Sequence, residues 1–360
     1  MKNYKLVLIV MMAAFLTACD KDDDPEVEEP TTNQSIKPNV GGPEQANQVY
    51  LDLGSREMVS SPRNSWDLAF YCGAEFKVIL NSSLGALTQA TAETMLSEIS
   101  VADTAGMENV LSLDAVFANM ISPTPEPWLP SAFTWADAPS GDLSQTAIAE
   151  ASDVTSNNMV YILNSGKNSD NSQRPWYKLK VDKSGDAYEL QFADFNGGAE
   201  QSATINKDNT YNFVYYSFEN GIVDVAPARS DWDIAFTTYT DYAFIGFNVP
   251  YFYKDFVIQN RAGVEVAEYI IGDEEVLLDE FNNFNIANAS LQTFSTNINT
   301  IGGNWRTVAT PDPTTVTAVK TDRFYIVKDA NGTYHKVLFS QMLSELGERG
   351  YPEILVETIQ

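Results

Sequence analysis

Apolar and polar residues alternate along much of the chain, and this alternation predicts β-strands. In the segment 232–236, Trp232, Ile234 and Phe236 would share one face of a strand, while Asp233 and Ala235 would lie on the other. Further segments are rich in the aromatic and β-branched residues that favour strands, namely 66–70, 176–181, 188–192, 211–218, 323–328, 333–339 and 353–357. The pattern therefore predicts a mainly β protein.

Turn signals separate these predicted strands, and helical signals are few. Asn331-Gly332 tolerates the positive φ of a tight turn and predicts a hairpin, and residues 182–186 predict a second one. Residues 122–130 include four prolines, so we expect an exposed loop there. The helical candidates are 88–98 and 108–120, which could carry helix or loop, and the short segment 340–347.

The strand pattern occurs twice in the same order. The sequence Asn-Ser-Trp-Asp-Leu-Ala-Phe at 64–70 returns as Ser-Asp-Trp-Asp-Ile-Ala-Phe at 230–236, which is 166 residues later. Two further segments, 49–53 and 160–163, return at offsets of 165 and 164 residues. This period is much longer than that of a solenoid repeat, so each copy predicts a whole domain.

We therefore expect two tandem β-sandwich domains, 46–203 and 204–360, with long loop excursions. Trp66 and Trp232 recur at the same place in each copy and are expected to anchor the two cores. Stacking of these tryptophans on a ligand is the alternative interpretation.

The first residues predict a cleaved lipoprotein signal. Lys2 and Lys5 precede an apolar run of about ten residues, which is too short to span a bilayer as a mature helix. Leu-Thr-Ala before Cys19 matches a bacterial lipobox, so residues 1–18 would be removed and Cys19 would carry lipid chains such as palmitate. An ordinary secretory signal is the alternative.

Residues 19–45 predict a disordered linker that is rich in acids and prolines. Its beginning, Cys-Asp-Lys-Asp-Asp, resembles the export signal that sends lipoproteins of some Gram-negative anaerobes to the outer face of the outer membrane. We therefore expect a lipid-anchored outer-membrane protein that faces the cell exterior. A tether without such an address is the alternative.

The net charge bears on which molecules the protein can bind, and the cysteine content bears on how its domains are stabilised. The net charge of −27 would become −29 after removal of the signal, which argues against nucleic acid as a partner. Cys72 would be the one cysteine besides Cys19, so there is no disulfide framework. The domains must be held together by core burial, and we expect a monomer.

The framework motifs point to a family. Residues 215–225, 231–236 and 323–339 of the second copy, and more loosely 66–70 and 159–163 of the first, resemble the HmuY-like lipoproteins. This resemblance implies a hand-like β-sandwich that clasps haem between loops at one end. It also implies a function in haem or iron acquisition, in which haem is passed to a TonB-dependent outer-membrane transporter.

The chain departs from the family in its iron ligands. The best-known members use two histidines, but this chain has one, His335, at a framework position within a predicted strand. Methionine is a suitable haem ligand, and some relatives use it. Met107 and Met120 lie in the excursion where the family places a haem-facing loop, so they are the candidate haem ligands, with core packing as the alternative. Tyr239 and Tyr242 are further candidates that no spacing selects.

We expect no enzyme. The sequence has no His-x-x-x-His pair, no Gly-x-Gly-x-x-Gly loop and no Cys-x-x-Cys, so it predicts no catalytic residues and no metal site apart from haem. The competing hypothesis is a surface binding or scaffold lipoprotein without haem, which recognises a protein, peptide or glycan.

Overall fold

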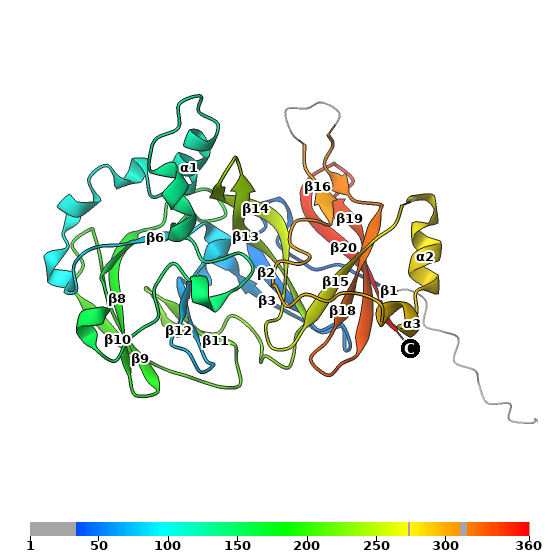
Figure 1. Cartoon of the computed structure of the whole chain (residues 1–360), viewed down its shortest axis with the longest axis horizontal. Coiled ribbons are helices and arrows are strands. Elements are labelled where there is room, and N and C mark those ends of the chain that lie inside the picture. Colours follow the sequence, from blue (N-terminus) through cyan, green and yellow to red (C-terminus); the bar gives the residue numbers. More distant parts are fainter. Residues whose placement is uncertain (1–33, 273, 310–314, 360) are drawn as a thin grey trace, which may run out of the picture. The chain divides into compact units, whose positions relative to one another are not determined.

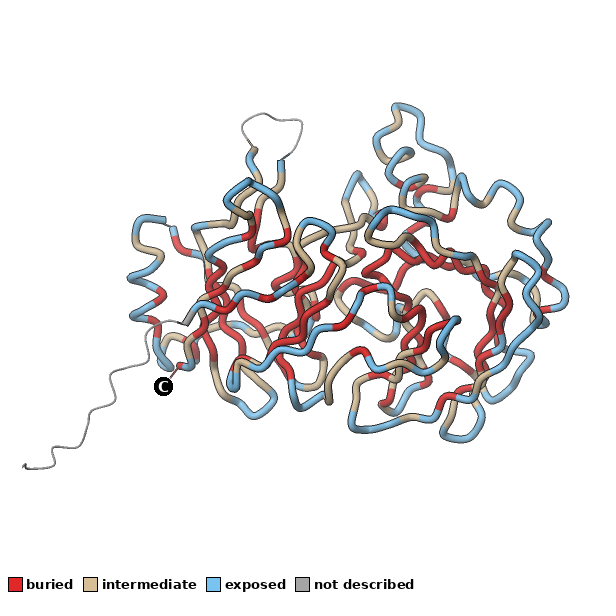
Figure 2. The backbone as a smooth tube through the Cα atoms, turned by 180° about the vertical axis from the view of Figure 1, so that it is seen from behind, coloured by how far each residue is buried: buried red, intermediate tan, exposed pale blue. Residues whose placement is uncertain are grey.

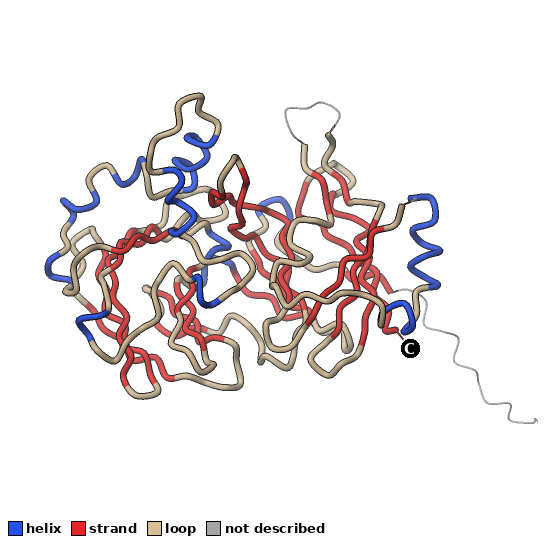
Figure 3. Tube along the Cα trace, in the orientation of Figure 1, coloured by secondary structure: helices blue, strands red, loops and turns tan. Residues whose placement is uncertain are grey.

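The computed structural model describes residues 34–359 except 273 and 310–314. The predicted signal, Cys19 and the first part of the linker lie outside these residues. Strands dominate the structure (Figures 1 and 3). They are β1 (Gln34–Ile36), β2 (Asn47–Leu51), β3 (Met58–Pro62), β4 (Leu68–Tyr71), β5 (Val78–Leu80), β6 (Leu87–Ala90), β7 (Tyr161–Asn164), β8 (Trp176–Ser184), β9 (Ala187–Asp194), β10 (Gln201–Asn206), β11 (Phe213–Ser217), β12 (Gly221–Val223), β13 (Ile234–Phe244), β14 (Asn248–Gln259), β15 (Glu265–Ile270), β16 (Arg306–Thr307), β17 (Ala318–Val319), β18 (Arg323–Lys328), β19 (Tyr334–Leu343) and β20 (Arg349–Ile359).

Helices in the described residues are short. The α-helices are α1 (Leu113–Met120), α2 (Leu277–Asn283) and α3 (Ile286–Ala289). The 3₁₀ turns are η1 (Gly42–Glu44), η2 (Arg63–Ser65), η3 (Ser82–Leu84), η4 (Leu96–Glu98), η5 (Val101–Thr104), η6 (Met107–Asn109), η7 (Leu129–Trp135), η8 (Leu143–Gln145), η9 (Thr155–Asn157) and η10 (Glu274–Val276). No helix among the described residues is long and apolar enough to cross a membrane.

Four antiparallel sheets build two sandwiches. The sheet β10-β9-β8-β7-β6 packs against β12-β11-β4-β5, and the apolar side chains between them form one core with Leu68, Leu179 and Leu190 fully buried. The sheet β1-β20-β19-β18-β15 packs against β14-β13-β2-β3 around a second core with Leu51, Ile234 and Val337. Figure 2 shows these buried positions following the strands, with the exposed residues in the connections. The prediction of a mainly β protein is confirmed.

Each sandwich takes strands from both predicted copies. Strand β2 of the first copy pairs with β13 of the second, in the register Leu51 to Ile234. Strand β11 of the second copy pairs with β4 of the first, in the register Tyr216 to Leu68. The two pairings correspond to each other at the offsets of 165 and 166 residues found in the sequence. We call β2 and β11 the exchanged strands, because each of them pairs with the Trp-Asp strand of the other sequence repeat.

The repeated Trp-Asp motif holds the exchanged strands. The carboxylate of Asp233 accepts a hydrogen bond of 2.8 Å from the backbone N–H of Leu53, just beyond β2. The carboxylate of Asp67 accepts the equivalent bond of 2.9 Å from the N–H of Phe218, just beyond β11. Each motif thus fixes the end of a strand that comes from the other copy.

The two tryptophans of the motif contact the same exchanged strands. Trp232 packs edge-to-face on Tyr50 of β2, with ring centroids 5.0 Å apart, and Trp66 packs on Tyr215 of β11 at the same distance. Both tryptophans are buried. They are core anchors, as the sequence predicted, although each anchors a strand of the other copy.

Most local predictions are confirmed, with three exceptions. The linker 19–45 is not disordered throughout, because β1 pairs with β20 and Val40 is buried in the core. The predicted hairpins are β8–β9 and β18–β19, and α1 lies within the helical candidate 108–120. Segment 340–347 is not a helix, because β19 continues to Leu343 and pairs there with Arg349 of β20. Segment 88–98 begins in β6 and ends in η4.

The predicted domain bounds, 46–203 and 204–360, stay a prediction. Residues 33–360 form one compact unit, and strand pairing crosses the bound between the two copies.

Candidate functional site

The long connection between β6 and β7 carries both candidate methionines. Its helix α1 begins at Ser112, whose hydroxyl accepts a hydrogen bond of 3.1 Å from the backbone N–H of Ala115. This hydrogen bond satisfies one of the backbone N–H groups that have no partner within the first turn of a helix. Val116 is fully buried and fixes the inner face of α1, so Phe117 and Met120 remain near the surface.

The hairpin β13–β14 of the second copy lies beside this connection (Figure 1). The rings of Phe117 on α1 and Tyr251 on β14 have centroids 5.7 Å apart. The hydroxyl of Tyr242 on β13 donates a hydrogen bond of 3.1 Å to the carbonyl of Phe133 on η7. Helix α1, η7 and the hairpin therefore form one group of contacting elements, drawn from both copies.

Large apolar side chains are exposed on these three elements. Phe244, at the end of the hairpin, is 75% exposed, and Ile121, directly after α1, is 65% exposed. We define the excursion surface as the set Phe117, Met120, Ile121, Phe133, Phe244 and Ile245. Apolar groups that gather at the surface mark sites where a protein, membrane or apolar ligand binds.

Nearby tyrosines keep their protons. Burial raises the pKa of Tyr242 to about 12, and the charges of Asp137 and Asp241 add to this effect. Burial likewise raises the pKa of Tyr239 to about 12. A tyrosine binds iron as the phenolate, so both candidate tyrosines are poor iron ligands in this environment.

The structure does not bring the two methionines into one cavity. Met120 is half-buried at the end of α1 and packs against the core beneath it. Met107 lines a separate hollow of about 280 Å³ that also includes Glu93, Glu98 and Asp103. Only Met120 belongs to the excursion surface.

His335 lies in β19, in the other sandwich from the excursion. It is 1% exposed, and its Nδ1 is 3.2 Å from the hydroxyl of Thr358. Its Nε2 is 3.5 Å from the carboxylate of Asp329. Burial lowers its pKa, so the imidazole is held neutral inside the framework. It occupies the framework position that the sequence indicated.

These residues could provide an iron ligand on one face of haem only. The aromatic groups of the excursion surface could stack on a porphyrin, its aliphatic groups could contact the porphyrin, and Met120 could supply one thioether to the iron. Among the described residues no group of three His, Cys, Asp or Glu side chains could hold a metal ion. A two-ligand clasp in the manner of the bis-histidine family members is not formed here.

Sequence reasoning did not find the aromatic part of this surface. The one available signal was Phe244-Ile245-Gly246-Phe247, an apolar sequence at a hairpin turn, where polar residues are usual. The turn itself has the usual glycine at a positive φ. Gly246 has φ 98°, a value that a residue with a side chain rarely adopts.

Comparison with known proteins finds a family model that matches most of the chain. A family model described as "HmuY protein" matches residues 44–206 and 209–355. This is a family of haem-binding proteins without enzymatic activity. No curated protein matches the chain.

Three solved structures are similar to the chain, each with a TM-score of 0.22. The apo HmuY analog of Tannerella forsythia is 14% identical and covers 49% of this chain and 90% of its own. A putative HmuY-like heme-binding protein of Bacteroides vulgatus is 9% identical and covers 89% of each chain. Apo PinO of Porphyromonas gingivitis is 15% identical and covers 52% of this chain and 99% of its own. Because the family model spans both copies and well over half of the sequence, the chain belongs to the HmuY family.

Proposed function

We propose that this protein is a lipid-anchored outer-membrane protein that captures haem at the cell surface and passes it to a TonB-dependent transporter. The observation that carries the proposal is the match of the haem-binding HmuY family to both copies. The lipobox before Cys19 and the acidic linker support the location.

The excursion surface is the proposed haem site. Phe117, Phe133 and Phe244 offer exposed rings on three contacting elements, and aromatic rings stack favourably on a flat π-system. Met120 is the methionine on these elements, half-buried at the end of α1. Met107 remains a candidate haem ligand, but it lies in a separate hollow and would bind the iron at a different place from Met120.

We also propose that the two copies arose by duplication of one HmuY-like domain. The repeated Trp-Asp motif supports this, because Asp67 and Asp233 make equivalent bonds to equivalent strands. The separate family matches of 44–206 and 209–355 support it as well.

The second candidate function is recognition of a non-haem ligand, such as a protein, peptide or glycan. The shortage of soft ligands favours it, because His335 is buried elsewhere and Met120 would be the single ligand at the excursion surface. The excursion surface would then serve as an apolar contact area for a partner.

Haem titration followed at the Soret band tests the proposal. We expect a saturable shift with the mature protein, and affinity at least about fivefold weaker in Met120→Leu, which keeps the side-chain volume but removes the sulfur. His335→Gln serves as the control and should leave the affinity unchanged, because His335 is buried in the other sandwich. No Soret shift in the wild type would rule out haem and favour the second function.

A further inference from the structure

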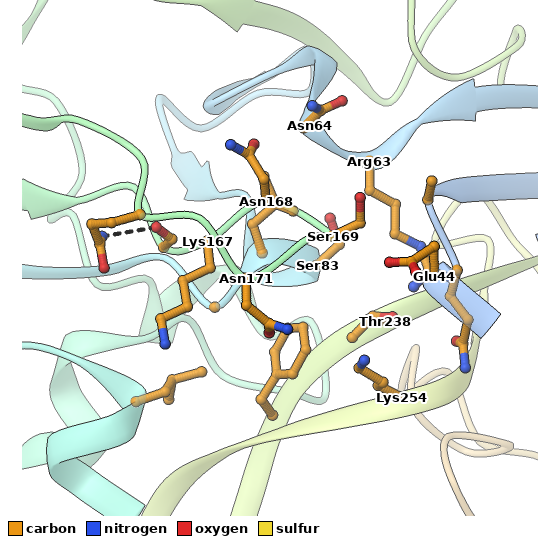
Figure 4. Close-up of a pocket in the computed structure, with 18 of the residues that line it drawn as sticks. Glu44, Arg63, Asn64, Ser83, Lys167, Asn168, Ser169, Asn171, Thr238 and Lys254 are labelled. Carbon is orange, nitrogen blue, oxygen red and sulfur yellow. Dashed lines mark hydrogen bonds between the residues drawn. The ribbon is translucent and has the colours of Figure 1, made fainter. Parts of the chain in front are cut away.

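A cavity separate from the excursion surface lies where the two copies meet around η2. It measures about 150 Å³ and is lined by residues from η2, η3, the start of α1, the connection between β7 and β8, and the strands β13 and β14 (Figure 4). A cavity of this volume is large enough for one molecule of about the size of benzene. The cavity is thus suited to a small molecule and is much smaller than a porphyrin requires.

The cavity contains a buried arginine without hydrogen-bond partners. Arg63 is 4% exposed, and its Nε and Nη2 atoms have no partner within the described residues. Buried polar groups in proteins are nearly always hydrogen-bonded, and a charged one without a partner is costly. Burial lowers the pKa of Arg63 to about 9, and the charge of Asp255 offsets this only in part.

The carboxylate of Asp255, whose charge acts on Arg63, is committed to other groups. Asp255 accepts a hydrogen bond of 2.6 Å from Nε of Arg349 and one of 2.6 Å from Nε2 of Gln45. Its carboxylate also lies 3.7 Å from Nε of Arg306. Three arginines therefore surround a single carboxylate, and Arg63 is the one that does not contact it.

Other lining groups add to the positive charge. Lys254 on β14 lines the cavity, and no ion pair of its ammonium is found in the described part of the chain. Thr238 on β13 contributes a hydroxyl, and Figure 4 shows both residues on the side of the cavity opposite Asn168. Lys167 also lines the cavity, but it is paired with Asp114 at the rim. The charged residues that line the cavity are Arg63, Lys167 and Lys254 and the acids Glu44 and Asp114, so the lining has a net charge of +1 in a chain of net charge −27.

The walls are held in place by close backbone packing. Gly166 has φ 75°, and a Cβ at this position would collide with the carbonyl oxygen of Leu84 on η3. The connection after β7 therefore rests directly on η3. Closely packed backbone segments therefore form part of the cavity wall, in addition to side chains.

We propose that this cavity binds the oxyanion of a small anionic molecule, a carboxylate or a phosphate, with Arg63 as the principal ligand. Arginine presents planar N–H groups that match both oxyanions. Lys254 supplies a second charge, and Thr238 supplies a neutral donor. The apolar Leu84 and Phe252, which also line the cavity, would contact the body of the molecule. This site is independent of haem binding at the excursion surface.

Thermal unfolding of the mature protein with inorganic phosphate, succinate or acetate, at constant ionic strength, tests the proposal. At about ten times the dissociation constant we expect the melting temperature to rise by about 2–4 °C with at least one anion. Arg63→Met should abolish this rise. It should not lower the melting temperature without anion, since it removes a buried charge that lacks a partner. Lys37→Met, at an exposed site, makes the same charge change and should leave the rise intact.

Two further variants keep the test decisive if Arg63→Met does not fold. Lys254→Met should weaken the binding at least about fivefold. Glu44→Gln should strengthen it, because it removes an exposed carboxylate that lines the cavity. The pH dependence separates phosphate from acetate: inorganic phosphate gains a second negative charge as the pH rises through neutrality, whereas acetate is already fully ionised there and gains none. No rise with any anion, or equal rises in the wild type, Arg63→Met and Lys254→Met, would overturn the proposal.

Discussion

At the scale of single residues, the aspartate of the Trp-Asp motif has a role that alternation does not reveal. The strand pattern placed Asp67 and Asp233 on the face opposite the tryptophans. In the structure both are buried and accept backbone N–H groups of the exchanged strands. A buried acceptor of this kind fixes a strand end because the N–H would otherwise lack a partner.

The charge of Asp233 makes stability depend on pH. Burial raises its pKa to about 6, the bond from Leu53 opposes this rise, and Asp52 and Asp329 add to it. In the unfolded chain the pKa is about 3.9. The folded state therefore binds the proton more tightly. The resulting stabilisation is complete below pH of about 4 and is lost as the pH rises through about 6.

Asp233→Asn should remove this dependence while keeping an oxygen for the N–H of Leu53. We expect the variant to be more stable than the wild type at pH 7.5, by on the order of 1–3 kcal/mol, and to show a smaller change in unfolding free energy between pH 4.5 and 7.5. Urea unfolding at both values measures this. Asp231→Asn is the control, because Asp231 is exposed and carries the same charge. If Asp233→Asn and Asp231→Asn change equally, the buried carboxylate does not act in this way.

At the scale of elements, the exchange of β2 and β11 makes the two copies depend on each other. Each exchanged strand lies between a strand of its own copy and one of the other, as β2 does between β3 and β13. Separation of the copies would expose edges on both sheets, and such edges are unstable or prone to pair again.

Cutting the chain between the copies tests this dependence. A protease site inserted between Asp208 and Asn209, both exposed in the connection from β10 to β11, allows cleavage without loss of a strand. We expect the two fragments to co-elute in size-exclusion chromatography and to unfold in one transition near that of the uncut protein. Two fragments that separate and remain folded would show independent domains.

The sequence predicted the strands well but could not predict their partners. Local alternation and the Asn331-Gly332 turn are sufficient for the hairpin β18–β19. The strand that pairs with β2 cannot be predicted in this way, because the repeated motif offers two equivalent strands, β4 and β13, with the same apolar pattern. Nothing in Leu51 or its neighbours distinguishes them, so only three-dimensional packing decides.

The candidate site was predicted in part. The departure from bis-histidine ligation follows from composition, and the place of His335 follows from strand alternation. The contact of α1 with the β13–β14 hairpin joins residues more than 120 positions apart, such as Phe117 and Tyr251, and no local pattern reports it. The burial of Arg63 could not be predicted either. Arg63 begins the short turn η2, and only tertiary packing buries it, so no local pattern reports it.

At the scale of the whole molecule, the proposed attachment to the membrane rests on Cys19. We expect Cys19→Ala to release the protein in soluble form or to leave it unprocessed, because the proposed lipid chains on this cysteine would provide the membrane affinity. Fractionation of cells, with protease added to intact cells to test surface exposure, measures both parts of the prediction. Unchanged membrane attachment of the variant would show that the lipobox is not used.

Hydrogen exchange with and without haem tests whether haem binds at the excursion surface. We expect slower exchange on haem binding in α1, in η7 and at the end of the β13–β14 hairpin, with β19 around His335 unchanged. Protection confined to β19, or no protection anywhere, would contradict this expectation.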